Sequence, residues 1–446
     1  MESQISDWFI GQLDDTLDTI AVNPALYAKR PGKDFTRNRR ITFQRLTKFF
    51  ITADGASLKK AITSFMHNQG QSPDISYQAF TKQRAKLTES APYTIFREFN
   101  KRTQHKDVNT YNNGYTPVAV DGTGVTIATN SNSESYIEES DSNQFWITTM
   151  FDTCNKTFID LDVRTRYKQY EVDSCLQMIE RNHFRPKSII IGDRLYGTLN
   201  LMGHLSDKEN LFYVLRWRTE NTLREIKELP DAELDVTREI TVISTQTNKD
   251  KKLLKEDKKY HFVPGKSKFG KEKKKVCWDK GNYFTMKFRI VKFRLVSGEW
   301  EVLTTNLPRE DFSVEDLKEL YHHRWCIETG FRHLKYDVGM INLHSKRDDF
   351  VIQDIYFAFT AFNLYSRIRE EIERCREKNT GLKYEYKTNI SQAFFLVRKA
   401  VQHKANPIRN LDCLIARHLI PVRPGRSDLR TNLKCKAITS FEYRVA

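Results

Sequence analysis

The chain has 446 residues, and lysine and arginine outnumber aspartate and glutamate by 73 to 57, which gives a formal net charge of +16. A chain of this length exceeds one ordinary core and predicts about two to four domains. The basic balance favours a polyanionic partner, nucleic acid first, over a small-molecule substrate. The alternative is a basic protein with no such partner.

Cysteine usage and hydropathy indicate the cellular compartment in which the chain is expected. Seven cysteines are scattered along the sequence without a CxxC pair, which favours reduced thiols in the cytoplasm and argues against zinc fingers. The N-terminus lacks a basic segment followed by an apolar run, and no stretch approaches about 18 uncharged apolar residues. The chain is therefore expected to be neither secreted nor membrane-spanning.

Residues 1–105 are predicted to be helical, because apolar residues recur three or four positions apart. The segment 72–87 fits the second helix of a helix-turn-helix, with Ser76 as the N-cap and with Lys82 and Arg84 directed at DNA. Short basic helices are also common as solvated surface, and that reading stays open.

The pattern changes from Tyr115 onward. β-Branched and aromatic runs predict three consecutive strands, followed by helix, strand, helix and strand, an order that indicates a mixed α/β sheet. Residues 218–298 predict an inserted, mostly-β subdomain with a lysine-rich loop at 248–276, either a solubilising flap or a DNA contact. Helices return after a cap at Ser313, and the chain ends in a helix and a basic tail.

Two aspartates follow apolar strands. Asp121 comes after Val118-Ala119-Val120, Asp193 comes after the run 188–192, and each has a glycine beside it. An unpaired buried carboxylate is costly, and a metal ion would compensate it. The carboxyl ends of sheet strands are also where open α/β folds gather ligands. Taken singly, each residue could equally be a strand-end aspartate that caps a glycine turn.

A predicted helix carries Tyr321, Arg324, Glu328 and Lys335. At about 100° per residue these four side chains fall within one narrow arc, and Arg332 borders it. An adjoining apolar stripe is expected to pack the helix on the sheet, and it consists of Ile327, Phe331 and Leu334. This placement would bring Glu328 to the two strand-end aspartates. A solvated, ion-paired surface is the alternative.

The four polar residues match the spacing Tyr-x2-Arg-x3-Glu-x6-Lys without a gap. In this the chain resembles the bacterial insertion-sequence transposases of the insertion sequence four type, over about residues 115–346. The resemblance implies an α/β, ribonuclease H-like catalytic domain at 106–375 that contains the insertion. Outside that stretch the match is only general, and helical pattern and charge predict a DNA end-binding region at 1–105 and a helical, basic region at 376–446 that could serve dimerisation.

The resemblance further implies a metal site and a reaction. Asp121, Asp193 and Glu328 would bind two Mg²⁺ ions, or Mn²⁺ in their place, and their carboxyl groups would converge on sites roughly 4 Å apart. The enzyme would cleave the ends of a mobile element in double-stranded DNA, through a hairpin, and join the 3′ ends to target DNA. A homodimer in the bacterial cytoplasm is expected, since two element ends must be brought together.

The remaining site residues take their roles from the same resemblance. Tyr321, Arg324 and Lys335 would hold phosphates, helped by Arg332 and by Arg194 of the Gly-Asp-Arg sequence. Trp300 would stack on a flipped base, although a core tryptophan in a strand is equally compatible with its context. Trp325 is expected to pack beside DNA.

One departure from the family pattern concerns the second aspartate. The acid-rich continuation that some relatives carry there is absent, and Leu195-Tyr196-Gly197 follows Arg194 instead. Two rival functions also remain: a ribonuclease H-like endonuclease of repair or recombination, and a domesticated transposase that only binds DNA.

Overall fold

The computed structural model describes residues 4–423 except 38, 54, 219–222, 270–271, 276, 296, 378–381 and 404–406, and it describes no side chains within 266–276. The predicted basic tail at 424–446 lies outside the described residues. None of the six cysteines described is in a disulfide, as the sequence predicted. Within the same residues, no helix has the length and apolar character that crossing a membrane requires.

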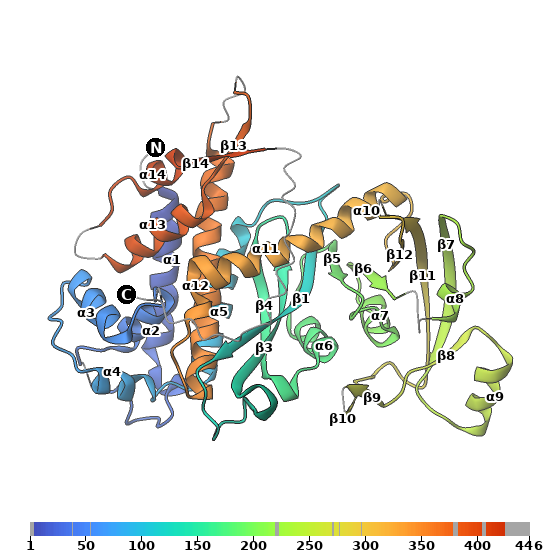
Figure 1. Ribbon diagram of the computed structural model, residues 1–446, viewed down its shortest axis with the longest axis horizontal. Coiled ribbons are helices and arrows are strands. Elements are labelled where there is room, and N and C mark those ends of the chain that lie inside the picture. Colours follow the sequence, from blue (N-terminus) through green and yellow to red (C-terminus); the bar gives the residue numbers. More distant parts are fainter. Residues whose placement is uncertain are drawn as a thin grey trace.

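The N-terminal region is helical, as predicted. Its helices pack against the long helix α12 at one end of the molecule (Figure 1). Helix α4 begins after Ser76, whose hydroxyl accepts a hydrogen bond from the Ala79 N–H, so the predicted N-cap is confirmed. The elements are α1 (Gln4–Val22), α2 (Phe43–Ile51), α3 (Leu58–Asn68), α4 (Tyr77–Arg84), α5 (Ser90–Thr103) and α12 (Asp348–Cys375).

A ten-stranded mixed sheet forms the centre of the molecule, in the order β2-β3-β1-β5-β6-β12-β11-β7-β8, with β4 paired to β3. The strands β1, β3 and β4 are antiparallel neighbours, whereas β5 and β6 run parallel to β1. This is the ribonuclease H-like arrangement that was expected. Its elements are β1 (Thr116–Ile127), β2 (Tyr136–Ile137), β3 (Ser142–Asp152), β4 (Thr157–Thr165), α6 (Glu171–Arg181), β5 (Ser188–Gly192), α7 (Leu199–Ser206) and β6 (Leu211–Trp217).

The inserted segment is mostly β, as predicted. Three of its strands continue the main sheet, whereas the other two pair with each other in a separate two-stranded sheet. Part of the predicted lysine-rich loop is helical, because Thr247 and Asp250 form a reciprocal capping box that starts α9. The elements of the insertion are α8 (Arg224–Lys227), β7 (Leu234–Ile243), α9 (Asn248–Glu256), β8 (Tyr260–Phe262), β9 (Lys266–Phe269), β10 (Glu272–Lys275) and β11 (Tyr283–Arg294), and β12 (Trp300–Thr305) follows.

The helix predicted to carry the signature is segmented. Helix α10 (Val314–His322) starts at a capping box between Ser313 and Asp316, and a 3₁₀ turn at His323–Trp325 leads into α11 (Cys326–His333). A π-helical turn, Leu334–Val338, ends the run. The apolar stripe is buried as predicted, with the Phe331 ring stacked on Phe158 of β4 at 5.9 Å.

The two faces of β1 bury different elements. Val118 and Val120 pack toward α6 and α7, whereas Ala119 belongs to the core formed with α11, α12 and the N-terminal helices. The side chain of Asp121, two positions after Ala119, therefore points to the side of the sheet that α11 covers. The C-terminal elements are β13 (Glu385–Thr388), α13 (Ile390–Gln402), α14 (Leu411–Arg417) and β14 (Leu419–Val422).

Candidate active site

Asp121 and Asp193 are neighbours because of the register between β1 and β5. The strands pair in parallel from Thr116 with Ser188 to Val120 with Gly192, so paired residues differ by 72 positions (188 − 116). Asp121 and Asp193 would be the next pair in that register. Two carboxylates far apart in sequence thus meet where parallel strands end, the place where open α/β sheets bind ligands.

Asp121 lies within β1 and not at its end. Beyond Val120 the strand continues to Ile127, paired with β3 alone, so Asp121 stands where β1 and β5 separate. Its Oδ1 accepts a hydrogen bond of 2.8 Å from the N–H of Gly122. The Asp121 side chain is partly exposed at this point, 23% by area.

The charges around Asp121 raise its proton affinity. Burial raises the pKa of Asp121 to about 6, and the nearby carboxylates of Asp193 and Glu328 add to the rise. The Gly122 N–H and the Arg324 guanidinium act in the opposite direction. Three carboxylates therefore share one region of negative potential, which a cation can relieve.

Asp193 occupies a tight turn directly after β5. Its Oδ1 accepts a hydrogen bond of 2.8 Å from the Leu195 N–H, and its carbonyl accepts one of 3.0 Å from the Tyr196 N–H. Arg194, which lies between Asp193 and these donors in the sequence, is exposed. The turn leaves the second carboxylate oxygen of Asp193 outside these bonds and holds Arg194 at the surface beside the site.

Glu328 is linked to Asp121 through Arg324. The Arg324 Nη1 lies 3.3 Å from Glu328 Oε1 and 3.7 Å from Asp121 Oδ2. The Arg324 side chain is buried, whereas Glu328 on α11 is exposed. The structure thus connects the predicted glutamate to the first aspartate, with a guanidinium between them.

The three carboxyl groups do not converge as tightly as predicted. Among the described residues, no three His, Cys, Asp or Glu side chains lie close enough together to hold a metal ion as they stand. The physical reason is repulsion between like charges, with the Arg324 guanidinium lying between two of them. The donors themselves are hard carboxylate oxygens, the ligand type that Mg²⁺ and Mn²⁺ prefer, so the residue set fits a divalent cation.

Tyr321 and Arg324 carry buried donors without acceptors. In the described part of the chain, neither the Tyr321 hydroxyl nor the Arg324 Nε finds a hydrogen-bond partner. Burial raises the pKa of Tyr321 to about 12, so its proton stays in place at neutral pH. Two unsatisfied donors beside a carboxylate site are suited to an anionic oxygen such as that of a phosphate.

The other side chains predicted to share this helix face lie farther apart. Lys335 lies on the π-helical turn, is half-buried, and makes no ion pair with the three carboxylates. Arg332 is exposed on the last turn of α11. Trp325 is 45% exposed, with the Arg324 guanidinium 4.6 Å from the centre of its ring. The 3₁₀ and π turns change the helical angles, so one regular arc does not describe these side chains.

Trp300 begins β12 and is half-buried between two cations. The Lys292 ammonium lies 4.6 Å and the Arg294 guanidinium 5.4 Å from the centre of its ring. The next residue, Glu301, is buried and forms a 3.0 Å ion pair with Arg216 of β6. Sequence reasoning missed this pair, because strand pairing between β6 and β12 creates it and no local motif signals it.

A fourth carboxylate near the aspartates was also missed. Glu171 begins α6 and is buried, and its Oε2 accepts a hydrogen bond of 3.0 Å from the Tyr196 hydroxyl. Burial raises the pKa of Glu171 to about 7, and the Asp121 and Asp193 carboxylates contribute to that rise. In the sequence Glu171 resembles an ordinary first-turn acidic residue, so only the fold reveals it.

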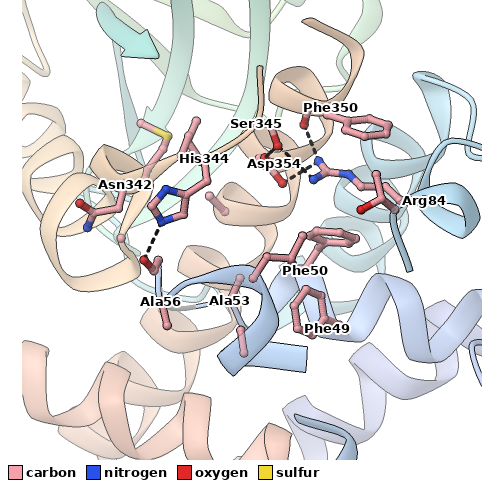
Figure 2. A pocket seen from close by; sticks show the side chains of 18 of the residues that line it. Phe49, Phe50, Ala53, Ala56, Arg84, Asn342, His344, Ser345, Phe350 and Asp354 are labelled. Atoms are coloured by element: carbon pink, nitrogen blue, oxygen red, sulfur yellow. Dashed lines mark hydrogen bonds and ion pairs between the residues drawn. The ribbon is translucent and has the colours of Figure 1, made fainter. Parts of the chain in front are cut away.

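Arg84 is not placed where DNA could reach it, and its predicted role is wrong. Its guanidinium is 5% exposed and donates to Asp354, Gln353 and Ser345 at 2.7–3.1 Å. Figure 2 shows it at the edge of a cavity of about 390 Å³, with the rings of Phe50 and Phe350 beside it. The inner face of α4 is used for packing against α12. Lys82, on the outer face, is exposed.

Comparison with known proteins adds a family match. A family model described as "Transposase DDE domain" matches residues 112–364, more than half of the chain, and this stretch contains Asp121, Asp193 and Glu328. No curated protein matches the sequence. Among solved structures, the chain is similar to a piggyBac transposase in a synaptic complex with hairpin DNA, with 12% sequence identity, a TM-score of 0.44, and coverage of 95% of this chain and 85% of that chain.

Proposed function

The chain belongs to the transposase DDE domain family of metal-dependent nucleases and polynucleotidyl transferases, and we propose that it is a cut-and-paste DNA transposase of the insertion sequence four type. It binds the terminal inverted repeats of a mobile element, cleaves the element ends through a hairpin, and joins the 3′ ends to target DNA. The observation that supports this proposal is twofold: Asp121 contacts Arg324, which also contacts Glu328, and the β1–β5 register makes Asp193 the neighbour of Asp121.

The proposed cofactor is a pair of Mg²⁺ ions held by Asp121, Asp193 and Glu328, with Mn²⁺ able to substitute. Bound there, the ions would activate the attacking oxygen and stabilise the leaving oxygen of a phosphodiester. Arg324 would then exchange its carboxylate partners for a DNA phosphate. This exchange accounts for its long contacts of 3.3 and 3.7 Å, which are weaker than those of a well-formed ion pair.

Phosphates near the cleavage point are proposed to bind Tyr321 and Arg324, whose buried donors lack acceptors among the described residues. Lys335, Arg332 and Arg194 would extend this contact along the strand. Burial lowers the pKa of Lys335, and an adjacent phosphate would restore its preference for the charged form. These assignments follow the Tyr-Arg-Glu-Lys signature and the geometry around it.

Trp300 is proposed to stack on a base flipped out at the hairpin. The ring is partly exposed, and the cations of Lys292 and Arg294 lie over it, so a base and its phosphate would both find complementary groups. Stacking of this kind offsets part of the cost of unstacking a base from the duplex.

Recognition of the element ends is proposed for the N-terminal region, but through a different surface from the predicted one. The loop between α1 and α2 exposes Lys29, Arg30, Lys33, Arg37, Arg39 and Arg40. Four of these residues and Lys86 line a polar hollow of about 400 Å³. With Arg84 buried, this loop and Lys82 are the better candidates for phosphate contacts. A homodimer, built through the C-terminal helices and located with the nucleoid in the bacterial cytoplasm, is proposed for synapsis.

A cleavage and strand-transfer assay tests the proposal. The substrate carries the inverted repeats that flank the gene, with Mg²⁺ or Mn²⁺, and Glu328→Gln is compared with wild type and with Glu315→Gln, an exposed glutamate of α10. Wild type and Glu315→Gln are expected to cleave and join, and Glu328→Gln to do neither.

Other outcomes would favour the rivals. Cleavage without joining would support a ribonuclease H-like endonuclease, and DNA binding without either reaction would support a domesticated, binding-only transposase. Wild-type rates for Glu328→Gln would show that the assignment of this glutamate is wrong.

A further inference from the structure

A buried carboxylate–phenol pair, Glu171 and Tyr196, packs against the backbone next to Asp121 and Asp193. Glu171 is 6% exposed and Tyr196 is 1% exposed, and the Tyr196 hydroxyl donates to Glu171 Oε2 at 3.0 Å. Neither residue belongs to the Asp-Asp-Glu set or to the Tyr-Arg-Glu-Lys signature. A pair this deeply buried is expensive to desolvate, and apolar residues of similar size would often be as stable, so stability alone does not explain it.

Tyr196 is tied to Asp193 through the chain and through packing. Its N–H donates to the Asp193 carbonyl at 3.0 Å and closes the turn that presents the Asp193 carboxylate. Its side chain also packs on Gly192, where an added Cβ would lie 2.6 Å from the Tyr196 Cβ. The Tyr196 ring is therefore in direct contact with the end of β5, next to Asp193.

Glu171 packs on a glycine of β1, the strand that carries Asp121. A Cβ added to Gly122 would lie 2.5 Å from Glu171 Oε2 and 2.4 Å from the Trp146 indole nitrogen. Gly122 is also the residue whose N–H binds the Asp121 carboxylate at 2.8 Å. The carboxylate of Glu171 thus sits against the backbone segment that orients Asp121, and only glycine leaves room for it.

The hydrogen bond between the two side chains therefore connects the two aspartate strands behind the site. Tyr196 packs on Gly192 and donates its N–H to the Asp193 carbonyl, and Glu171 packs on Gly122, whose N–H binds Asp121. The pairing of β1 with β5 stops at Val120 and Gly192, so strand hydrogen bonds no longer set the separation of the aspartates. The Glu171–Tyr196 pair packs against both strands at this point.

We propose that Glu171 and Tyr196 are a pair of positioning residues whose hydrogen bond sets the separation and orientation of Asp121 and Asp193 for a divalent cation. The inference rests on the proposed metal site and adds to it. Neither residue would touch the cation, the DNA or the reacting atoms. Both would act through the backbone of the neighbouring aspartates, as residues that orient metal ligands commonly do.

The test measures Mn²⁺ affinity of the full-length protein by calorimetry, without DNA, and so does not depend on turnover. Tyr196→Phe removes only the hydroxyl, Glu171→Ala removes the acceptor, and Glu171→Gln keeps an acceptor oxygen. Tyr115→Phe is the matched control, since the buried Tyr115 donates to Asp311 at 2.8 Å at the opposite end of β1.

Tyr196→Phe and Glu171→Ala are each expected to weaken Mn²⁺ binding about tenfold or more. The double variant should be no weaker than the worse single variant, because both changes break one connection. Glu171→Gln should bind more tightly than Glu171→Ala, and Tyr115→Phe should match wild type. Thermal unfolding shows which variants fold, and Tyr196→Phe keeps the test valid if Glu171→Ala does not.

Two results would overturn the inference while the metal site stands. One is unchanged Mn²⁺ affinity in Tyr196→Phe and Glu171→Ala while Asp193→Asn loses binding. The other is equal loss in both Glu171 variants with none in Tyr196→Phe, which would assign the effect to charge and not to the pair. By contrast, wild-type affinity in Asp121→Asn and Asp193→Asn would overturn the proposed metal site itself.

Discussion

Two buried arginines, both predicted from the sequence to contact DNA, occupy opposite electrostatic situations. Arg84, between α4 and α12, donates to three side chains at 2.7–3.1 Å and lies about 4 Å from the centres of two phenylalanine rings (4.1 and 4.4 Å). Arg324, before α11, has contacts of only 3.3 and 3.7 Å, and its Nε has no partner within the described part of the chain.

The difference separates a structural charge from a functional one. A buried charge whose every nitrogen is hydrogen-bonded has little capacity left for a ligand, and it fixes how two elements pack. A buried charge with weak contacts and a spare donor, beside carboxylates of altered proton affinity, is typical of a binding or catalytic site. Burial alone does not distinguish the two cases, whereas the count of satisfied donors does.

The largest expected effect concerns the carboxylates that Arg324 contacts or neighbours. Asp193→Asn should lower DNA cleavage by roughly 1,000-fold or more, since it removes a proposed metal ligand with little change in side-chain size. Single-turnover cleavage rates with Mg²⁺, compared with circular dichroism of the same preparation, would check this. Residual cleavage within tenfold of wild type would mean that Asp193 is dispensable.

Substitution of the two arginines by methionine should have opposite effects on stability and on cleavage. Arg84→Met is expected to lower the free energy of unfolding by about 3 kcal/mol, because it leaves the half-buried Asp354 without its ion-pair partner. Arg324→Met should change stability little but reduce cleavage about 100-fold, through loss of a phosphate contact. Urea unfolding and single-turnover rates, both measured for each variant, would separate the effects. If both substitutions lowered the free energy of unfolding equally, the distinction between Arg84 and Arg324 would be wrong.

A smaller effect concerns pH. The pKa of Asp121 in the folded protein, about 6, exceeds its unfolded value of about 3.9, so the folded state favours the protonated carboxyl group. Ionised Asp121 therefore destabilises the fold, with a cost that is absent below about pH 4 and complete above about pH 6. Without added metal, Asp121→Asn should be more stable than wild type by about 1–2 kcal/mol at pH 8 and by almost nothing at pH 4.

Urea unfolding at pH 4, 6 and 8 in the presence of a chelator would measure this difference. If Asp121→Asn were more stable than wild type by the same amount at all three pH values, the cause would be packing and not ionisation of Asp121.

The smallest expected effect lies on the N-terminal surface. Lys33→Ala should weaken DNA binding a few-fold for every sequence and reduce the slope of log affinity against log salt by about 1, as one lost phosphate contact does. Lys82→Ala is expected to do the same, whereas Arg84→Met should leave the slope unchanged in the folded fraction. Fluorescence anisotropy across a salt series would measure the slopes.

The sequence predicts the elements well because their signals are local. Apolar alternation marks β1 and β5, and the caps at Ser76 and Ser313 mark two helix starts. The neighbouring position of Asp121 and Asp193 could also be predicted, since both follow apolar strands of one sheet. The apolar side of the helix that carries Glu328 was equally visible, because Ile327 and Leu334 repeat at helical spacing.

The predictions fail mainly where contacts between residues far apart in the sequence determine the position of a side chain. Nothing near Arg84 reveals that Asp354, 270 positions away, takes its charge. The Glu171–Tyr196 pair depends on how α6 sits against two strand ends, and an isolated glutamate at a helix start carries no such signal. The one-arc geometry failed for a local reason, since 3₁₀ and π turns interrupt the helix between Tyr321 and Lys335.

The most direct test of the metal-site account is a crystal structure of the protein with Mn²⁺ and an element end, with Mn²⁺ located by anomalous scattering. We predict Mn²⁺ among the carboxylates of Asp121, Asp193 and Glu328, with the Arg324 guanidinium moved from Asp121 to a DNA phosphate. Mn²⁺ bound only elsewhere, or Arg324 still placed between Asp121 and Glu328 in the presence of DNA and metal, would contradict it.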